Sequence, residues 1–140
     1  MAEALLRQAA RGEGLPIEVA SAGTAANPGL PAAEHAITVM QERGADLAGH
    51  HAQSLTAEVI AAQDLVLTMT RRHAEEAKRL APAQASKIFT FSDYVGSNRA
   101  DIPDPFFGPL EGYRSTATVL QELVQALVVK LKGETGGAGA

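Results

Sequence analysis

The chain has 140 residues, with 12 Lys and Arg against 16 Asp and Glu and a formal net charge of −4. This length predicts one domain, and the charge offers no broad basic surface, which excludes nucleic acid as the main partner. The longest apolar run is far shorter than the ~20 residues of a spanning helix, and the first residues lack a secretion signal, so we expect a cytoplasmic protein without a membrane partner. The chain holds no Cys, which excludes disulfides, thiolate zinc sites and a cysteine nucleophile within these residues.

Helices are indicated by apolar residues that recur every three or four positions and by residues that start or stop a helix. Thr56 and Thr70 are expected as N-caps, because a hydroxyl can accept hydrogen bonds from the free backbone N–H groups of the first turn. Gly12 and Gly14 are expected to end the first helix and Gly44 the second. The predicted helices cover residues 2–10, 31–43, 56–62, 70–80 and 113–131.

Short apolar or β-branched runs predict strands between these helices, at residues 17–20, 65–69 and 87–91. The run 65–69 is expected to be buried on both faces. Residues 92–110 form a long irregular stretch with three Pro, and loops of this length are usually functional or disordered. Residues 1–132 are expected as the domain and 133–140 as a flexible tail. The alternation of strands and helices predicts an α/β fold.

Three pieces of the sequence, in this order, resemble the low-molecular-weight protein tyrosine phosphatases. Residues 1–6, Met-Ala-Glu-Ala-Leu-Leu, are similar to the start of the family's first helix, and residues 21–23, Ser-Ala-Gly, to the loop after its second strand. Residues 101–106, Asp-Ile-Pro-Asp-Pro-Phe, are similar to its general-acid loop. The resemblance runs from residue 1 to about 131. It implies a three-layer α/β fold with helices on both faces of a parallel sheet.

The resemblance also implies that a segment is missing. In that family a first strand, central in the sheet, and a loop of Cys, five residues, Arg, Ser or Thr and Pro directly precede the Met that matches Met1. We therefore expect the chain to be truncated at its N-terminus, without the first central strand and the nucleophile loop. The helix that begins at Ala2 also lacks a capping side chain in front of it, although an ordinary protein can simply start with a helix.

Asp104 is the expected catalytic residue. In phosphoryl transfer a carboxylic acid in line with the departing atom supplies its proton, and an Asp before Pro has a restricted backbone. An isolated Asp-Pro is usually a turn, but the resemblance implies the general acid, with Asp101 as the rival in the same loop. The resemblance further implies Phe106 as an aromatic wall of the substrate cleft, against the alternative that it packs in the core beside Phe107.

Two further residues are expected to support the missing phosphate loop. His50 matches a family histidine that does so through hydrogen bonds, although a solvated histidine is the commoner outcome. Ser21 either orients that loop or begins a turn before Gly23. No metal is expected, because the His residues lack a second ligand at suitable spacing, and no cofactor is expected, because no P-loop or dinucleotide fingerprint is present.

The function implied by the resemblance is that of a protein phosphatase acting on phosphoarginine or phosphotyrosine in proteins through a Cys phospho-enzyme. Met69 followed by Thr70 is closer to the bacterial protein arginine phosphatase branch. The present chain is expected to be inactive because it has no nucleophile. The alternative is a catalytically dead relative that binds phosphoproteins or another partner. A flavodoxin-like signalling domain ranks third, because no acidic cluster follows a strand.

Overall fold

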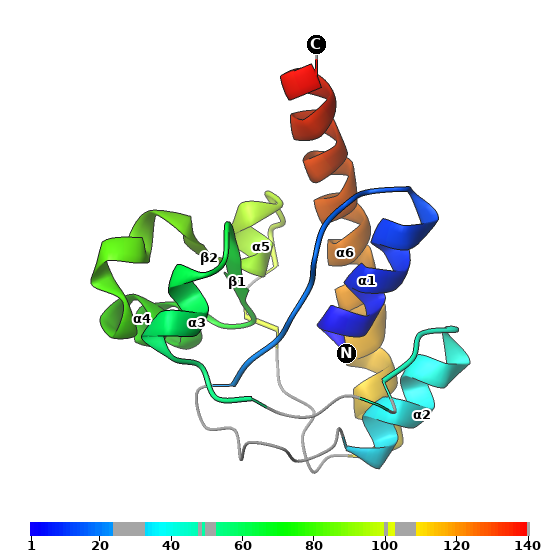
Figure 1. Ribbon diagram of the computed structural model, residues 1–140. Helices are drawn as coiled ribbons and strands as arrows, with labels where there is room; N and C mark the ends of the chain where they lie inside the picture. The colour runs from blue at the N-terminus through cyan, green and yellow to red at the C-terminus, as the bar shows by residue number, and fades with distance from the viewer. Residues whose placement is uncertain (24–32, 48, 50–52, 100, 103–108, 140) are drawn as a thin grey trace. The chain divides into compact units, whose positions relative to one another are not determined.

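The computed structural model describes residues 1–23, 33–47, 49, 53–99, 101–102 and 109–139 (Figure 1). Their contacts form two compact units, each considered by itself. The first contains α1 (Ala2–Gly12), α2 (Glu34–Glu42) and α6 (Leu110–Gly139). The second contains α3 (Ala57–Ala61), β1 (Val66–Thr68), α4 (Arg71–Leu80), the 3-10 helix η1 (Pro82–Lys87), β2 (Ile88–Thr90) and α5 (Phe91–Tyr94).

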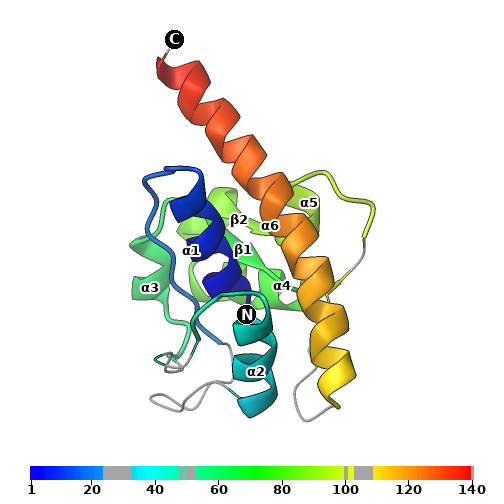
Figure 2. The same cartoon turned by 90° about the vertical axis from the view of Figure 1, so that its right-hand side faces the viewer.

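In the first unit, α1 and α2 both pack against α6 (Figures 1 and 2). In the last helix, the apolar residues at every third or fourth position of the predicted range 113–131 form the buried face, except that Leu131 is only half-buried. The buried members of this apolar stripe are Tyr113, Ala117, Leu120, Val124, Leu127 and Val128. Val39 and Met40 of α2 are fully buried. The predicted helix ends are confirmed at α1, which stops at Gly12, and at α2, which is followed by Gly44 at a φ of +76°.

Polar contacts also join α2 to α6. The guanidinium of Arg114 donates to both carboxylate oxygens of Glu42, at 3.1 and 2.7 Å, and contacts Glu111 as well. The hydrogen bond from Arg114 lowers the pKa of the Glu42 carboxyl. Arg43, directly after α2, contacts Gln121 and donates to the hydroxyl of Thr118 at 2.9 Å. These contacts fix the C-terminal end of α2 along the surface of α6.

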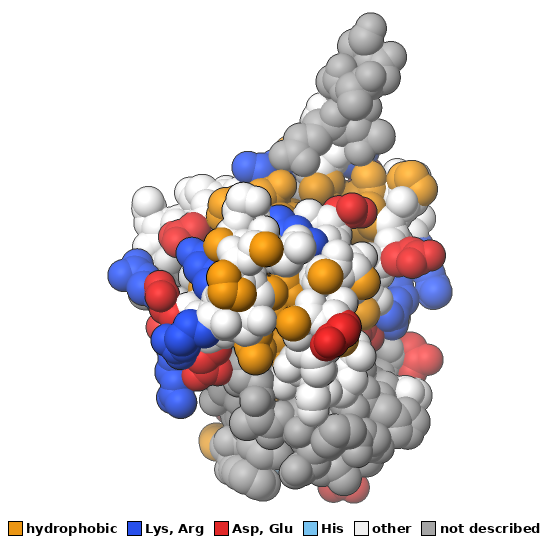
Figure 3. Space-filling model, turned by 60° about the vertical axis from the view of Figure 1, so that its left-hand side comes forward, with side chains coloured by type: hydrophobic (Ala, Val, Ile, Leu, Met, Phe, Trp, Pro, Cys, Tyr) orange, Lys and Arg blue, Asp and Glu red, His pale blue; other side chains and the backbone are white. Residues whose placement is uncertain are grey.

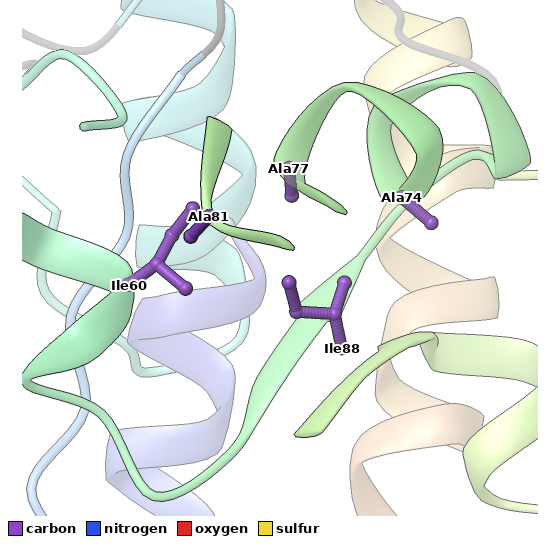
Figure 4. Close-up of a cluster of buried hydrophobic side chains, with 5 residues drawn as sticks. All are labelled: Ile60, Ala74, Ala77, Ala81 and Ile88. Atoms are coloured by element: carbon purple, nitrogen blue, oxygen red, sulfur yellow. The ribbon is translucent and has the colours of Figure 1, made fainter. Parts of the chain in front are cut away.

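In the second unit, β1 and β2 form a parallel pair in which Val66 lies opposite Ile88 and Thr68 opposite Thr90. The connection runs through α4, as parallel strands require. Ile60 of α3 and Ile88 of β2 are buried together with three alanines (Figure 4). Two of these alanines belong to α4, and the third follows it directly. Those alanines are Ala74, Ala77 and Ala81. Small side chains on α4 allow the helix to lie close to the strand pair.

The capping predictions are confirmed. The Thr56 hydroxyl accepts from the backbone N–H of Val59 at 3.1 Å, and the Thr70 hydroxyl accepts from that of His73 at 3.1 Å. Each bond satisfies one of the backbone donors that the first turn of a helix leaves without an intrahelical partner. Thr90 caps the short α5 in the same way. This helix begins at Phe91, predicted as the end of a strand, and continues into the stretch that was predicted to be irregular.

The strand predicted at residues 17–20 is wrong, because residues 15–22 contain no strand. No described strand lies beside them, and the Val19 carbonyl accepts instead from the Arg7 guanidinium at 2.8 Å. The expected burial of residues 65–69 on both faces is also wrong. Only Thr68 is buried, since among the described residues β2 alone flanks this strand.

The predicted flexible tail is helical in the structure. The last helix begins at Leu110 and continues to Gly139, well past the predicted end at residue 131. Residues 133–139 contain four Gly, each of which lowers helix stability by about 1 kcal/mol, so the composition of this segment favoured a flexible tail. The second helix, predicted to start at residue 31, starts at Glu34 among the described residues.

The described strands thus give an α/β structure with a small parallel sheet. The three-layer arrangement and the missing central strand stay predictions. Within the described part of the chain, no helix is both long and apolar enough to cross a membrane.

Candidate active site

The carboxyl end of β1 leads directly into the N-terminus of α4. Thr68 closes the strand, and its buried hydroxyl donates to the carbonyl oxygen of Thr70 at 2.9 Å. Arg71 then begins the helix. Because ligands of parallel α/β sheets bind outside the carboxyl ends of the strands, this strand-to-helix junction is the part of the second unit that suits a site.

Residues 101 and 102 return to this junction. The Asp101 carboxylate accepts a hydrogen bond from the backbone N–H of Arg71 at 2.8 Å. The backbone N–H of Ile102 donates to the carbonyl oxygen of Met69 at 2.9 Å, and Ile102 is buried, with 2% of its surface exposed. A carboxylate is favourable at the N-terminus of α4, where backbone N–H groups carry partial positive charge. The start of the predicted general-acid loop is therefore attached to the end of β1.

Asp104, Phe106 and His50, all singled out from the sequence, lie outside the described residues. Ser21 is described and half-buried, and its carbonyl oxygen accepts from the Gln53 side chain at 2.8 Å. Two residues later, Gly23 forms a parallel bridge with Ser54. The structure thus links the Ser-Ala-Gly segment to residues 53–55, a pairing that sequence reasoning did not predict.

Asp101 entered the sequence analysis only as a rival acid, and its contact with α4 was missed. Asp101 and Arg71, which share this hydrogen bond, are 30 positions apart in the chain, so no local sequence pattern predicts it. One indirect signal was present. Thr70 marks the start of a helix directly after a strand, and such a junction leaves several backbone donors that a distant carboxylate can satisfy.

Charges of both signs lie side by side on the face shown in Figure 3, around apolar side chains. The described residues of this face present no extended area of one sign. Within the described ranges, no group of three or more His, Asp or Glu side chains is placed to hold a metal ion.

A separate depression lies in the first unit, beside the C-terminal half of α1. Its lining residues are Arg7, Ala10, Arg11, Leu15, Ile17, Glu18 and Val19. The Arg7 guanidinium there is engaged by Glu3 at 3.1 Å as well as by the Val19 carbonyl. Ser21 and Asp101, the described residues that were singled out from the sequence, do not line this depression.

Comparison with known proteins gives consistent matches. The profile of the family described as low molecular weight phosphotyrosine protein phosphatase matches residues 1–136. The chain is 37% identical over 132 residues to a protein-arginine-phosphatase of Bacillus subtilis, covering 94% of this chain and 87% of that protein. It is 33% identical over 132 residues to a probable low molecular weight protein-tyrosine-phosphatase, EpsP, of Ralstonia nicotianae, covering 94% and 86%.

The structural comparison agrees. A cysteine-to-serine mutant of the YwlE arginine phosphatase, with a phosphorylated active-site serine, matches with a TM-score of 0.90 at 37% identity. That match covers 94% of this chain and 86% of the phosphatase. The sequence motifs, the α/β structure and both comparisons lead to one conclusion. The chain belongs to the low-molecular-weight phosphotyrosine protein phosphatase family.

Proposed function

We propose that this chain belongs to a cysteine-dependent protein phosphatase that releases phosphate from phosphoarginine or phosphotyrosine in proteins. The observation that carries the proposal is the family match over residues 1–136, which includes the acid-loop sequence at 101–106. The attachment of residues 101 and 102 to the end of β1 supports it, because a residue that transfers a proton must be held in a defined position.

In the proposed reaction a cysteine thiolate attacks phosphorus and the bond from phosphorus to the leaving oxygen or nitrogen breaks. Asp104 gives its proton to that departing atom. A water molecule then attacks the phosphocysteine, the Asp104 carboxylate accepts a proton from this water, and phosphate leaves with the thiolate restored. Phe106 forms a wall of the substrate cleft in this scheme, and Ser21 and His50 support the loop that holds the phosphate.

The nucleophile of this scheme comes from outside the 140 residues, because these contain no Cys. We propose that a first strand and a phosphate-binding loop with Cys and Arg complete the protein. The backbone N–H groups and the Arg of that loop stabilise the phosphate oxygens in the transition state. By itself the 140-residue chain is then inactive.

Two substrates fit the family. Identity to an arginine phosphatase is 37% and identity to a probable tyrosine phosphatase is 33%, a difference too small to choose between them. Thr70 after Met69 favours the arginine branch. Both a phenyl ring and a guanidinium can stack on the aromatic ring that we assign to the cleft wall.

The absence of Cys also favours a second candidate, a phosphatase-like module that binds phosphoproteins or another partner without catalysis. One experiment separates the two. The protein is produced from its complete reading frame, and phosphate release is measured from one protein that carries phosphoarginine and another that carries phosphotyrosine. The phosphatase proposal predicts turnover of at least one substrate. Binding of a phosphoprotein without any release contradicts it and supports the binding module.

A further inference from the structure

We propose that Asp101 is a positioning residue, which holds the start of the segment that carries Asp104 at the carboxyl end of β1. The inference rests on the proposed function, since it assigns a task within that reaction. It gives Asp101 a different role from the rival acid of the sequence analysis. Asp101 acts on the reaction through the placement of Asp104 and not by giving up a proton.

The first support is the pair of hydrogen bonds on either side of Thr70. Asp101 accepts through its side chain from the N–H of Arg71 at 2.8 Å, and Ile102 donates through its backbone to Met69 at 2.9 Å. Two successive residues of one segment are thus attached to the two residues that flank the N-cap of α4. A single bond would allow the segment to swing, whereas two bonds fix both its position and its direction.

The second support is the packing of the attachment. Ile102 is buried and anchors the segment by its side chain as well as its backbone. Asp101 itself is exposed, so the burial of apolar surface does not explain why a carboxylate stands at this position. The N–H of Arg71 belongs to the first turn of α4 and has no partner within the helix, and the Asp101 oxygen supplies that partner.

The third support is the short covalent distance from this anchor to the acid. Asp104 follows Ile102 by two residues, so only Pro103 separates the anchored residue from the proposed acid in the chain. A shift at the anchor therefore passes almost directly to the general acid. Because a misplacement of 1 Å can lower a rate by about 10²-fold, loss of the anchor should be visible in turnover.

The test uses the phosphatase made from the complete reading frame, with p-nitrophenyl phosphate as substrate and inorganic phosphate as inhibitor. Asp101→Ala should lower kcat by about 10- to 100-fold, while the inhibition constant of phosphate stays within about twofold, because the anchor acts on proton transfer and not on phosphate binding. Asp101→Asn keeps an acceptor oxygen and should restore most of kcat. Amide hydrogen exchange of Ile102 should accelerate in the Ala variant and not in the Asn variant.

Thr56→Ala is the matched control, since it also removes one capping bond of a helix in the same unit. It should lower stability by a similar amount and leave kcat unchanged, which separates positioning from general loss of stability. Full activity of Asp101→Ala in an active phosphatase would overturn this inference alone, and so would an equal loss of kcat in the Asn variant. An inactive wild-type protein would overturn the proposed function and this inference with it.

Discussion

The backbone N–H of Ile102 donates to the carbonyl oxygen of Met69 at 2.9 Å, which places the start of the predicted acid loop beside the residue that follows β1. Met69 continues into the capped N-terminus of α4, and Ile102 continues toward Asp104. This hydrogen bond thereby joins the junction between β1 and α4 to the segment that follows β2 and α5 in the chain.

The 140-residue chain should hydrolyse neither p-nitrophenyl phosphate nor a protein that carries phosphoarginine. Loss of the nucleophile alone costs about six orders of magnitude in a comparable covalent mechanism. Phosphate release from the purified chain is the measurement. Turnover that disappears in Asp104→Ala would contradict the assignment of the nucleophile to a segment outside these residues.

The same chain should unfold at low urea or in a broad transition. A missing central strand of about five buried apolar residues would remove roughly 7 to 15 kcal/mol, comparable with the stability of a whole domain. Circular dichroism is the suitable probe, because the chain has no Trp.

The comparison protein for this test is the chain extended by an apolar strand and phosphate loop, which should unfold cooperatively. A sharp transition at high urea for the 140-residue chain would show that it folds stably without an added strand. The catalytically dead binding module would then be the better reading.

Ile60→Ala should strongly destabilise the second unit. The Ile60 side chain is fully buried in the cluster of Figure 4, so truncation removes its burial and leaves a cavity beside the alanines of α4. The expected loss in free energy of unfolding is about 2 to 5 kcal/mol. Urea unfolding of the extended chain measures it. Leu80→Ala is the control, since Leu80 is 45% exposed and its loss should change stability little. Equal effects of the two variants would contradict the described core.

The pKa of Glu42 should rise toward its ordinary value in Arg114→Ala, because the hydrogen bond from that guanidinium is the main cause of its lowered pKa. A lowered folded pKa means that the pair stabilises the fold above the ordinary range of Glu. This stabilisation is lost as the pH falls from the ordinary pKa of Glu through the lowered pKa of Glu42 in the folded protein. Carbon NMR of the Glu42 carboxyl during a titration measures the shift.

Arg72→Ala is the matched control for that titration, since Arg72 pairs with Glu76 on α4 and has no contact with Glu42 among the described interactions. It should leave the Glu42 pKa unchanged. If Arg114→Ala also leaves it unchanged, the hydrogen bond between Arg114 and Glu42 is absent in solution.

Local features of the structure could be predicted from the sequence and long-range ones could not. Thr56 and Thr70 start helices as expected, because a cap depends on a hydroxyl and the few residues after it. The stripe from Tyr113 to Val128 is buried as expected, since its spacing alone defines a helical face. The strand predicted at residues 17–20 is absent, because a strand needs an adjacent strand for its hydrogen bonds. The composition of the segment does not reveal whether such a strand is present.

In the candidate site, too, local sequence patterns could be predicted and long-range contacts could not. The order of residues 101–106 predicts an acid loop, and the role of Asp104 in it stays a prediction. The attachment at Asp101 and Ile102 could not be predicted, because hydrogen bonds to Arg71 and Met69 depend on how the chain returns to β1. The pairing of Gly23 with Ser54 was missed for the same reason.

The central claim is that Asp104 is the general acid of a cysteine-dependent phosphatase, and its most direct test is turnover by the protein from the complete reading frame. Asp104→Ala should lower kcat for p-nitrophenyl phosphate by roughly 10² to 10⁴, with little change in inhibition by phosphate, because the carboxyl acts on the departing atom and not on the phosphate oxygens. Asp101→Ala should lose a smaller factor. A larger loss in Asp101→Ala than in Asp104→Ala would contradict the account and move the acid to Asp101.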